Sequence, residues 1–516
     1  MSNAKILWTD DEIDLLRPHI LFLEQKGYEI ITASNGDDAL EIVKTQTLDL
    51  VFLDENMPGL SGLETLSKLK AIKPNLPVIM ITKSEEENIM DAAIGSQIRD
   101  YLIKPVNPNQ ILLSIKKNID VKKLVSKETV SAYQSEFSQI SMQISMARDF
   151  KEWDEIYRKL VHWDIELEKS ADTGMSDVLK MQKTEANVEF AKYIKNNYLD
   201  WFNESGEKPL LSQNLIKEAA ADILKNNDKV MFLLIDNLRY DQWKALQPNI
   251  EENFNVELDT TYYSILPTAT QYARNAMFAG LMPSEIAQLY PNFWLNDEDE
   301  GGKNQFENEL IATNLKRLGI NKKFVYEKIS NARSTQKFIS QINNLLNNNI
   351  IFLVYNFIDI LSHANTDVEM VRELAHDDSA YRSLTKSWYQ HSDLQQLLQV
   401  IAEKGVKVII TTDHGTIRVQ KPIKVVGDKA TSRNLRYKTG KNLGYNAREV
   451  FEVNNPSMAF LPKSNLSSRY IFALESNFFA YPNNYNHYVS YYTNTFQHGG
   501  VSMEEMIVPY IVLNPK

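Results

Sequence analysis

The sequence contains no cysteine, and no apolar run approaches the ~20 residues that a membrane-spanning helix needs. The first absence excludes disulfide bonds, thiolate zinc fingers, iron–sulfur clusters and cysteine nucleophiles. A bound metal ion would therefore need histidine, aspartate or glutamate ligands, and the chain has only 8 histidines. The second absence predicts a soluble protein without a membrane partner, which we expect to be cytoplasmic.

The amino terminus and the charge balance favour the same interpretation. The apolar stretch before Asp10 is too short for a signal peptide. The chain has 56 Lys+Arg against 67 Asp+Glu, a net charge of −11. This excess of negative charge argues against a protein that coats nucleic acid, although a local basic site remains compatible with it.

The length of 516 residues predicts about three domains, at roughly 150 residues per domain. In residues 1–120, short apolar runs alternate with segments of helical periodicity. This alternation is typical of a doubly wound α/β domain with a five-stranded parallel sheet. The predicted strands are Lys5–Trp8, Glu29–Thr32, Leu50–Leu53, Val78–Thr82 and Tyr101–Ile103.

Residues 121–206 lack strand signals. An amphipathic stripe with three- and four-residue spacing runs from Phe137 to Leu160, and a further helical pattern runs from about Asp177 to Phe202. We expect an all-helical bundle that connects two α/β domains. Residues 207–516 predict the second, larger α/β domain, with buried strands at Val230–Asp236, Ile351–Asp359, Val406–Asp413, Met458–Pro462 and Met506–Leu513.

Acidic residues follow two strands of the first predicted sheet. Asp10 and Asp11 come after the first strand, and Asp54 comes after the third. Clustered carboxylates at the carboxyl ends of parallel strands normally hold a hard cation such as Mg²⁺. Thr82 ends the fourth strand and Lys104 follows the fifth. A hydroxyl and an ammonium group opposite a metal-bound carboxylate suit an incoming phosphoryl group.

These residues, with the segment Asp54–Gly59, occur in the order and spacing of a known family, and residues 4–120 resemble the receiver domain of bacterial response regulators. The resemblance implies that a sensor histidine kinase phosphorylates Asp54 and that phosphorylation drives formation of a homodimer. The residues that it implies for Mg²⁺ binding and for switching are Asp10, Asp11, Asn56, Thr82, Tyr101 and Lys104.

The third domain has a second set of ligand-type residues near strand ends. Three aspartates and three histidines are candidates for one edge of its sheet: Asp236, Asp359, His363, Asp413, His414 and His498. Aspartate and histidine together suit Zn²⁺ at catalytic sites. Six ligands suffice for two metal ions, which can clamp the two oxygens of an in-line phosphoryl displacement.

A nucleophile for such a displacement lies in the segment Leu266–Arg274, which contains Thr268 and Thr270. A threonine hydroxyl becomes a good nucleophile when a metal ion lowers its pKa. A helix start, with its partial positive charge, would favour an anionic group at the same place. The residue pattern by itself leaves both threonines as candidates.

The Pro-Thr-Xaa-Thr segment, Asp359 with His363, Asp413-His414-Gly415 and His498-Gly499-Gly500 together resemble the alkaline phosphatase superfamily, and within it the PglZ-type domain. The resemblance extends over about 300 residues. It implies one zinc ion held by Asp236, Asp413 and His414, a second held by Asp359, His363 and His498, and Thr270 as the nucleophile between them.

A basic segment follows Asp413-His414 in the sequence. Between Arg418 and Lys441 there are eight basic residues and one acidic residue, which gives a local charge of +7. We interpret it as a mobile loop that binds a polyanionic substrate such as a nucleotide or short oligonucleotide. The substrate-binding candidates are Arg433, Arg436 and Lys438. The alternative is a solvated loop.

Across nearly its whole length the sequence resembles the PorX-type response regulators associated with type IX secretion. No DNA-reading module is identified, so we expect an enzymatic or protein–protein output. The first hypothesis is a regulator whose output domain is a zinc-dependent phosphohydrolase, in particular a phosphodiesterase. The second is a non-enzymatic platform in which that domain binds a partner such as a sigma factor.

Overall fold

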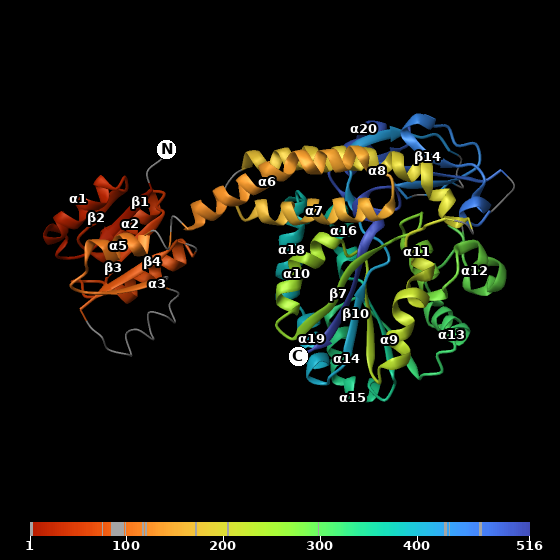
Figure 1. The fold of residues 1–516 in the computed structure, drawn as a ribbon, viewed down its shortest axis with the longest axis horizontal. Coiled ribbons are helices and arrows are strands. Elements are labelled where there is room, and N and C mark those ends of the chain that lie inside the picture. The colour runs from red at the N-terminus through yellow and green to blue at the C-terminus, as the bar shows by residue number, and fades with distance from the viewer. Residues whose placement is uncertain are drawn as a thin grey trace. The chain divides into compact units, whose positions relative to one another are not determined.

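The computed structural model describes residues 4–74, 76–83, 98, 100–115, 118, 121–170, 173–203, 206–297, 299–427, 431–432, 434–463 and 467–516. The chain forms two compact units (Figure 1). The first comprises Met1–Ala132 with Lys169–Asp172, and the second comprises Tyr133–Glu168 with Thr173–Lys516. Among the described residues, no helix has the length and apolar character needed to cross a membrane.

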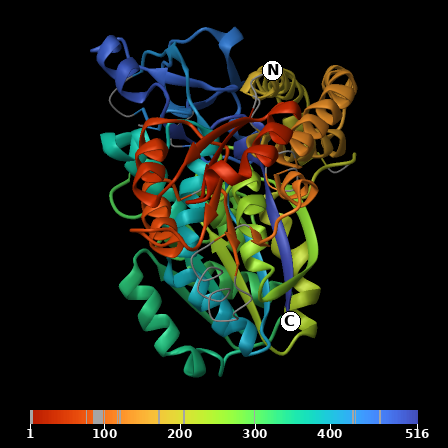
Figure 2. The same ribbon diagram turned by 90° about the vertical axis from the view of Figure 1, so that its left-hand side faces the viewer.

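The first unit contains the predicted five-stranded parallel sheet, with strand order β2-β1-β3-β4-β5. Because helices cover both faces of such a sheet, its central strands are continuous apolar runs, and all five residues of β3 are buried. Helices α2 and α3 pack on one face and α1 and α5 on the other (Figure 2). The strands are β1 (Lys5–Thr9), β2 (Glu29–Ala33), β3 (Leu50–Asp54), β4 (Val78–Thr82) and β5 (Asp100–Ile103), and the helices are α1 (Arg17–Gln25), α2 (Gly36–Thr45), α3 (Gly62–Ile72) and α5 (Pro108–Ile115).

The loop after β3 is fixed by the start of α3. Ser61 and Glu64 form a capping box, in which each side chain satisfies a backbone N–H of the other residue. Gly62 lies so close to β3 that an added Cβ would be 2.3 Å from the carbonyl oxygen of Asp54. This close approach holds the loop against the strand end that carries Asp54.

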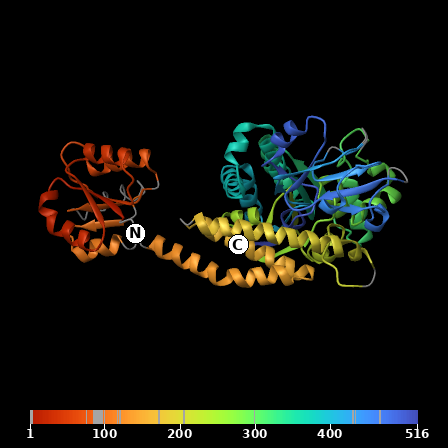
Figure 3. The ribbon, with the colours of Figure 1, turned by 90° about the horizontal axis from the view of Figure 1, so that it is seen from above.

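The helical linker consists of α6 (Val121–Met146), α7 (Phe150–Glu168) and α8 (Thr173–Asn197), which lie alongside one another (Figure 3). The stripe predicted as one helix from Phe137 to Leu160 is instead divided between α6 and α7. Asp149 ends the run because its carboxylate accepts the backbone N–H groups of Lys151 and Glu152, at 2.8 Å and 2.9 Å, as an N-terminal cap does.

The linker and the larger α/β domain belong to the same compact unit. Tyr263 donates its hydroxyl to the carbonyl of Phe150 at 2.8 Å, and Arg158 donates to the carbonyl of Asp259 at 3.2 Å. These bonds join α7 to β7 (Phe254–Tyr263), an edge strand of the large sheet.

The large sheet has six strands in the order β7-β18-β10-β6-β9-β8. Strands β10, β6, β9 and β8 are parallel, whereas β18 is antiparallel to both of its neighbours, β10 and β7. The fold-class prediction of a multidomain α/β protein with a helical connector is confirmed. Besides β7, the strands are β6 (Val230–Ile235), β8 (Phe324–Ile329), β9 (Ile350–Tyr355), β10 (Lys407–Thr411) and β18 (Ile507–Pro515).

Two predicted strands of this domain need correction. Met458–Pro462 is not a strand but overlaps the 3₁₀ helix η8 (Pro456–Ala459), because Pro456 fixes a φ suited to a helix start and cannot donate to a ladder. The strand predicted to reach Asp359 ends at Tyr355, and Asp359 lies in the first turn of α16 (Phe357–Asp367).

Further helices surround the large sheet, and small sheets form the region around β14 and α20 in Figure 1. The small sheets are β11-β17, β12-β16 and β13-β15-β14. Their strands are β11 (Ile417–Arg418), β12 (Lys421–Lys424), β13 (Tyr437–Gly440), β14 (Val450–Val453), β15 (Arg469–Ala473), β16 (Asn477–Ala480) and β17 (Phe496–Gln497). The helices are α9 (Ala221–Asn226), α10 (Tyr240–Ile250), α11 (Thr270–Ala279), α12 (Pro283–Leu289), α13 (Glu307–Arg317), α14 (Ala332–Ser340), α15 (Ile342–Leu345), α17 (Glu369–Leu374), α18 (Asp378–Gln390), α19 (Asp393–Glu403), α20 (Tyr485–Tyr492) and α21 (Met503–Met506).

Candidate phosphorylation site and metal centres

The carboxyl edge of the first sheet brings three acidic side chains together. Oxygen atoms of Asp10, Asp11 and Asp54 lie within 4.8 Å of one another. Lys104 places its Nζ 2.8 Å from Asp10 Oδ2 and 3.0 Å from Asp54 Oδ2. Burial raises the pKa of Asp54 to about 6, with a further contribution from the Asp10 charge, while Lys104 opposes the rise. A divalent cation here would relieve the repulsion among the carboxylates.

The remaining switch candidates lie around this cluster. The Thr82 hydroxyl is buried and donates to the carboxylate of Glu55, the residue after Asp54. Tyr101 is half-buried, and Asn56 is exposed beside Asp54. Glu55 therefore holds the hydroxyl that the family resemblance assigns to the phosphoryl group.

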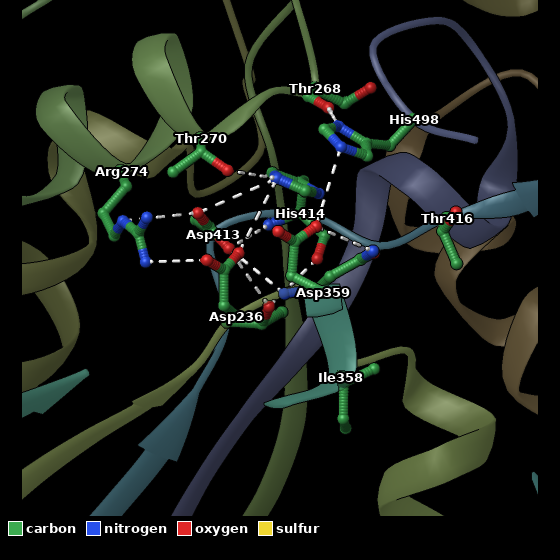
Figure 4. Close-up of polar contacts among 12 residues, drawn as sticks. Asp236, Thr268, Thr270, Arg274, Ile358, Asp359, Asp413, His414, Thr416 and His498 are labelled. Atoms are coloured by element: carbon green, nitrogen blue, oxygen red, sulfur yellow. Dashed lines mark hydrogen bonds and ion pairs between the residues drawn. The ribbon is translucent and has the colours of Figure 1, made fainter. Parts of the chain in front are cut away.

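The carboxyl edge of the large sheet gathers the six other candidate ligands into two clusters. One comprises Asp236, Asp413 and His414, and the other comprises Asp359, His363 and His498; within each, one potential ligand atom per residue lies within 4.8 Å of the others. The imidazoles of His414 and His498 stack with ring centroids 4.1 Å apart, so the clusters are adjacent (Figure 4).

The ends of β6 and β10 and the start of α16 bring these ligands together. Asp236 follows β6 directly, and Asp413 follows β10 by two residues. Asp359 and His363 are four residues apart on α16, so their side chains share one face of that helix. The chain turns sharply after Asp236, where Asn237 has a φ of 65°. Its side-chain amide donates to Ser362 Oγ at 3.1 Å and links the strand end to α16.

Electrostatics in the two clusters suit metal ions. Burial raises the pKa of Asp236 to about 6 and raises the pKa of Asp413 and Asp359 as well. Burial also lowers the pKa of His414 to about 4 and that of His498 to about 3. Both imidazoles are therefore neutral near pH 7, the form that binds a metal ion.

Two buried carboxylate oxygens give a further reason why these residues suit zinc. Asp236 Oδ1 and Asp413 Oδ2 are buried without a hydrogen-bond partner. Buried carboxylate oxygens are normally hydrogen-bonded or metal-bound, because an unpartnered buried charge is costly. Each cluster also offers three ligands of the nitrogen–oxygen type with one position left for a substrate or nucleophile, which is typical of a catalytic zinc site.

The structure distinguishes the two candidate threonines. Thr270 is the first residue of α11, and its Oγ1 lies 3.1 Å from His414 Nε2 (Figure 4). Thr268 Oγ1 instead accepts the N–H of Gly499 at 3.0 Å and lies 3.0 Å from the carbonyl of Gly500. The Thr268 side chain is fully buried and its hydroxyl is already hydrogen-bonded, whereas the Thr270 hydroxyl lies next to the cluster of Asp236, Asp413 and His414.

Arg274, the last residue of the threonine segment, is a further charged residue of this site. Four residues after Thr270 on α11, its Nη1 lies 3.0 Å from Asp236 Oδ2 and its Nε 3.6 Å from Asp413 Oδ2. Its Nε also lies 2.8 Å from Glu307 Oε1 on α13. Figure 4 shows the guanidinium directed at the two aspartates. The four-residue spacing from the threonine was the one available sequence signal.

The sequence predicts that Arg436 and Lys438 lie on a mobile substrate-binding loop, but the structure encloses both side chains. Arg436 is fully buried and forms an ion pair with Glu505 at 2.5 Å. Lys438 is also buried on β13, donates to the carbonyl of Ser432 at 2.8 Å and has its pKa lowered by burial to about 7. Both side chains are enclosed by the protein, so neither is free to contact a polyanion. Arg433 lies outside the described residues.

Comparisons with known proteins match three successive segments of the chain. Family models match residues 6–116 as a response regulator receiver domain, 123–202 as the PorX response regulator linker domain and 215–513 as the BREX system PglZ alkaline phosphatase-like domain.

Curated relatives and solved structures match the receiver segment. PhoP of Bacillus subtilis, the alkaline phosphatase synthesis transcriptional regulatory protein, is 34% identical over 27% of this chain and 56% of its own length. AlgB of Pseudomonas aeruginosa, an alginate biosynthesis transcriptional regulatory protein, is 32% identical over 24% of this chain and 28% of its own. A receiver structure from Clostridium thermocellum is 35% identical, with a TM-score of 0.22, and covers 23% of this chain and 98% of that one. The chain thus spans about half of PhoP and less of AlgB.

Fold and sites together define a response regulator whose output domain has an alkaline phosphatase-like fold. The chain belongs to the PglZ alkaline phosphatase-like family, whose model covers more than half of its length. Its order of receiver, linker and PglZ domain is that of the PorX-type response regulators, which confirms the prediction made from the sequence.

Proposed function

We propose that this protein is a cytoplasmic two-component regulator of type IX secretion whose output domain is a zinc-dependent phosphodiesterase. The observation that carries the enzymatic part is the pair of three-ligand clusters with the Thr270 hydroxyl 3.1 Å from His414 Nε2. A sensor histidine kinase would phosphorylate Asp54, with Mg²⁺ bound beside Asp10 and Asp11. Dimerisation would follow, as the receiver family implies.

Zinc ions in the two clusters would supply Lewis-acid stabilisation of the phosphoryl oxygens and of the nucleophile. The Thr270 hydroxyl gives up its proton, its oxygen attacks phosphorus, and one alcohol of the diester leaves after taking up a proton. The threonine then carries the phosphate together with its remaining ester group. Water attacks that phosphorus, returns a proton to the threonine oxygen and releases a phosphomonoester. The start of α11 places Thr270 where the helix dipole favours negative charge.

Nucleotides or short oligonucleotides are the proposed substrate class. Two of the three cationic candidates for contacting them are buried, so the proposal now depends on the phosphodiester chemistry of the site rather than on Arg436 and Lys438. A screen of dinucleotides, cyclic nucleotides and phosphomonoesters, with and without a phosphodonor, would identify the preferred leaving group.

The test combines metal analysis with turnover. We expect the purified protein to contain about two zinc ions and to hydrolyse a chromogenic phosphodiester. Thr270→Ala should reduce kcat by at least about 10³-fold, because the nucleophile is lost. Thr313→Ala, on α13, is the matched control, since its hydroxyl bonds only to the carbonyl of Leu310. Zinc retention without turnover would favour the non-enzymatic platform, with a sigma factor as the partner to test.

A further inference from the structure

The four-residue helix α21 contacts the neighbours of both stacked histidines. Gly415, which follows His414, donates its N–H to the carbonyl of Glu505 at 3.1 Å. An added Cβ on Gly415 would lie 1.9 Å from the carbonyl oxygen of Glu504, so the two backbones are in direct contact. On the side of His498, the N–H of Gly500 donates to Glu505 Oε1 at 2.9 Å.

Glu505 is the centre of this arrangement. Its buried carboxylate pairs with Arg436 Nη2 at 2.5 Å and accepts the Ser502 hydroxyl at 2.7 Å. It lies 3.4 Å from Thr268 Oγ1, and the carbonyl of Thr268 is 3.1 Å from His498 Nδ1. A hydrogen bond to the second ring nitrogen fixes the tautomer and orientation of a metal-binding histidine. The position of α21 therefore affects how His498 faces the second cluster.

Helix α21 is in turn held by the linker. Asn187 on α8 accepts the N–H of Met503 at 2.9 Å and donates to Glu504 Oε2 at 2.9 Å. Asn187 and Glu504 are each only 6% exposed, so water does not replace these bonds. One residue of the linker thus bonds to both the backbone and a side chain of the helix that supports the two histidines.

Helix α8 is fixed next to this contact. Lys183, four residues before Asn187 on the same helix face, places its Nζ 2.9 Å from Asp164 Oδ2 on α7. Arg382 on α18 lies 2.7 Å from the same carboxylate oxygen. An ion pair therefore joins α7 to α8, and hydrogen bonds join α8 to α21.

From this contact we propose that Asn187 is a positioning residue for His414 and His498, and that movement of α8 in the linker changes the output site through α21. The inference rests on the proposed function of the clusters as a zinc-dependent hydrolytic site. It makes the linker a structural part of that site.

An exchange of acid and amide tests the contact. Asn187→Asp keeps an acceptor for Met503 but sets a carboxylate against Glu504. We expect weaker zinc binding and lower kcat on a chromogenic phosphodiester, each by about 10-fold, with little change in KM. Adding Glu504→Gln restores an amide–carboxylate pair with the two groups exchanged, so both values should return close to wild type.

The matched control is Gln182→Glu on the same helix. Gln182 is also buried, but its bonds to Tyr133, Phe137 and Ser141 stay inside the linker. It should leave zinc binding and kcat unchanged. Zinc affinity is measured in the full chain by competition with a chromogenic chelator, and circular dichroism compares the folds. Asn187→Ala, which adds no charge, should show a smaller loss in the same direction.

The inference is overturned by wild-type zinc affinity in Asn187→Asp, by failure of Glu504→Gln to restore it, or by an equal loss in Gln182→Glu. A wild-type protein that binds zinc but turns over none of the phosphoesters contradicts the proposed function instead. In that case the zinc affinities alone still decide whether Asn187 positions the histidines.

Discussion

At the scale of single residues, Arg274 shows how the output domain keeps several buried acids close together. Asp236, Asp413 and Glu307 all lie within 3.6 Å of its guanidinium nitrogens, and all four side chains are at most 1% exposed. A single cation that compensates three carboxylates in a dry environment has a large effect when it is removed. The metal ion proposed for this cluster would supply positive charge at the same aspartates.

Replacing Arg274 with methionine should therefore be strongly destabilising in the absence of metal. We expect a loss of about 3–5 kcal/mol in the free energy of unfolding in EDTA, because the carboxylates are left uncompensated. Zinc should recover part of the loss, so the zinc-induced rise in Tm should be larger in Arg274→Met than in wild type. Thermal melts with EDTA and with zinc measure this, and Arg333→Met, an exposed arginine on α14, is the control. Equal melting temperatures in EDTA would contradict the role of Arg274.

Asp54 predicts a pH dependence whose sign follows from its raised pKa. The folded protein keeps this proton up to about pH 6, whereas an unfolded aspartate releases it near pH 3.8. Its stabilising contribution is thus fully present below pH 3.8 and is lost as the pH rises through about 6. In EDTA, Asp54→Asn should raise the receiver's Tm by about 5 °C at pH 7.5 and have little effect near pH 4. Calorimetry at several pH values measures it, and a gain confined to acidic pH would refute the prediction.

At the scale of elements, the sequence was sufficient to predict the strands that are buried on both faces. The receiver strands β1, β3 and β4 and the strands β6, β10 and β18 of the large sheet are largely buried apolar runs, because both faces of each are covered. It was insufficient for the edge strands β7 and β8, since exposed residues interrupt their apolar pattern. The break between α6 and α7 could not be predicted, because the apolar spacing continues across the capping residue Asp149.

The residues of the candidate sites could likewise be predicted only in part. Ligand-type residues near strand ends could be predicted, because parallel strands deliver their carboxyl ends to one edge. Residues that act through tertiary contacts, such as Glu55 and Asn187, carry no sequence signal since their partners are remote in the chain. The prediction for Arg436 and Lys438 failed because a count of charges does not show that a side chain is buried. Arg436 pairs with Glu505 inside the fold, and Lys438 donates to the carbonyl of Ser432.

The attachment of α18 to the linker gives an element-scale prediction. Arg382 is 3% exposed and lies 2.7 Å from Asp164, 2.8 Å from Glu168 and 3.0 Å from Asp241. Arg382→Met should lower the free energy of unfolding by about 3 kcal/mol, because it removes a buried cation that Asp164, Glu168 and Asp241 share. Urea unfolding measures the change. Lys192→Met, from an exposed pair with Glu189, should cost less than about 1 kcal/mol. A similar cost for both variants would mean that the buried network does not hold α18 to α7.

At the scale of the whole molecule, the boundary between the two compact units falls within α6, between Ala132 and Tyr133. The same helix thus leaves the receiver unit and enters the unit that holds both candidate metal-binding clusters. The local charge of +7 overstates the positive surface available to a substrate, since Arg436 and Lys438 of that basic segment are buried.

If the receiver controls the output domain, that control depends on the carboxylate of Asp54. With acetyl phosphate and Mg²⁺, wild type should shift from monomer toward dimer in light scattering, and its phosphodiester turnover should change by at least about 3-fold, the effect of a coupling free energy near 0.7 kcal/mol. Asp54→Ala should show neither response while keeping wild-type zinc content, because its substitution lies in the other compact unit. Asp37→Ala, an exposed aspartate of α2, should respond as wild type does. An Asp54→Ala protein that dimerises and responds to phosphodonor like wild type would show that the output is controlled from elsewhere.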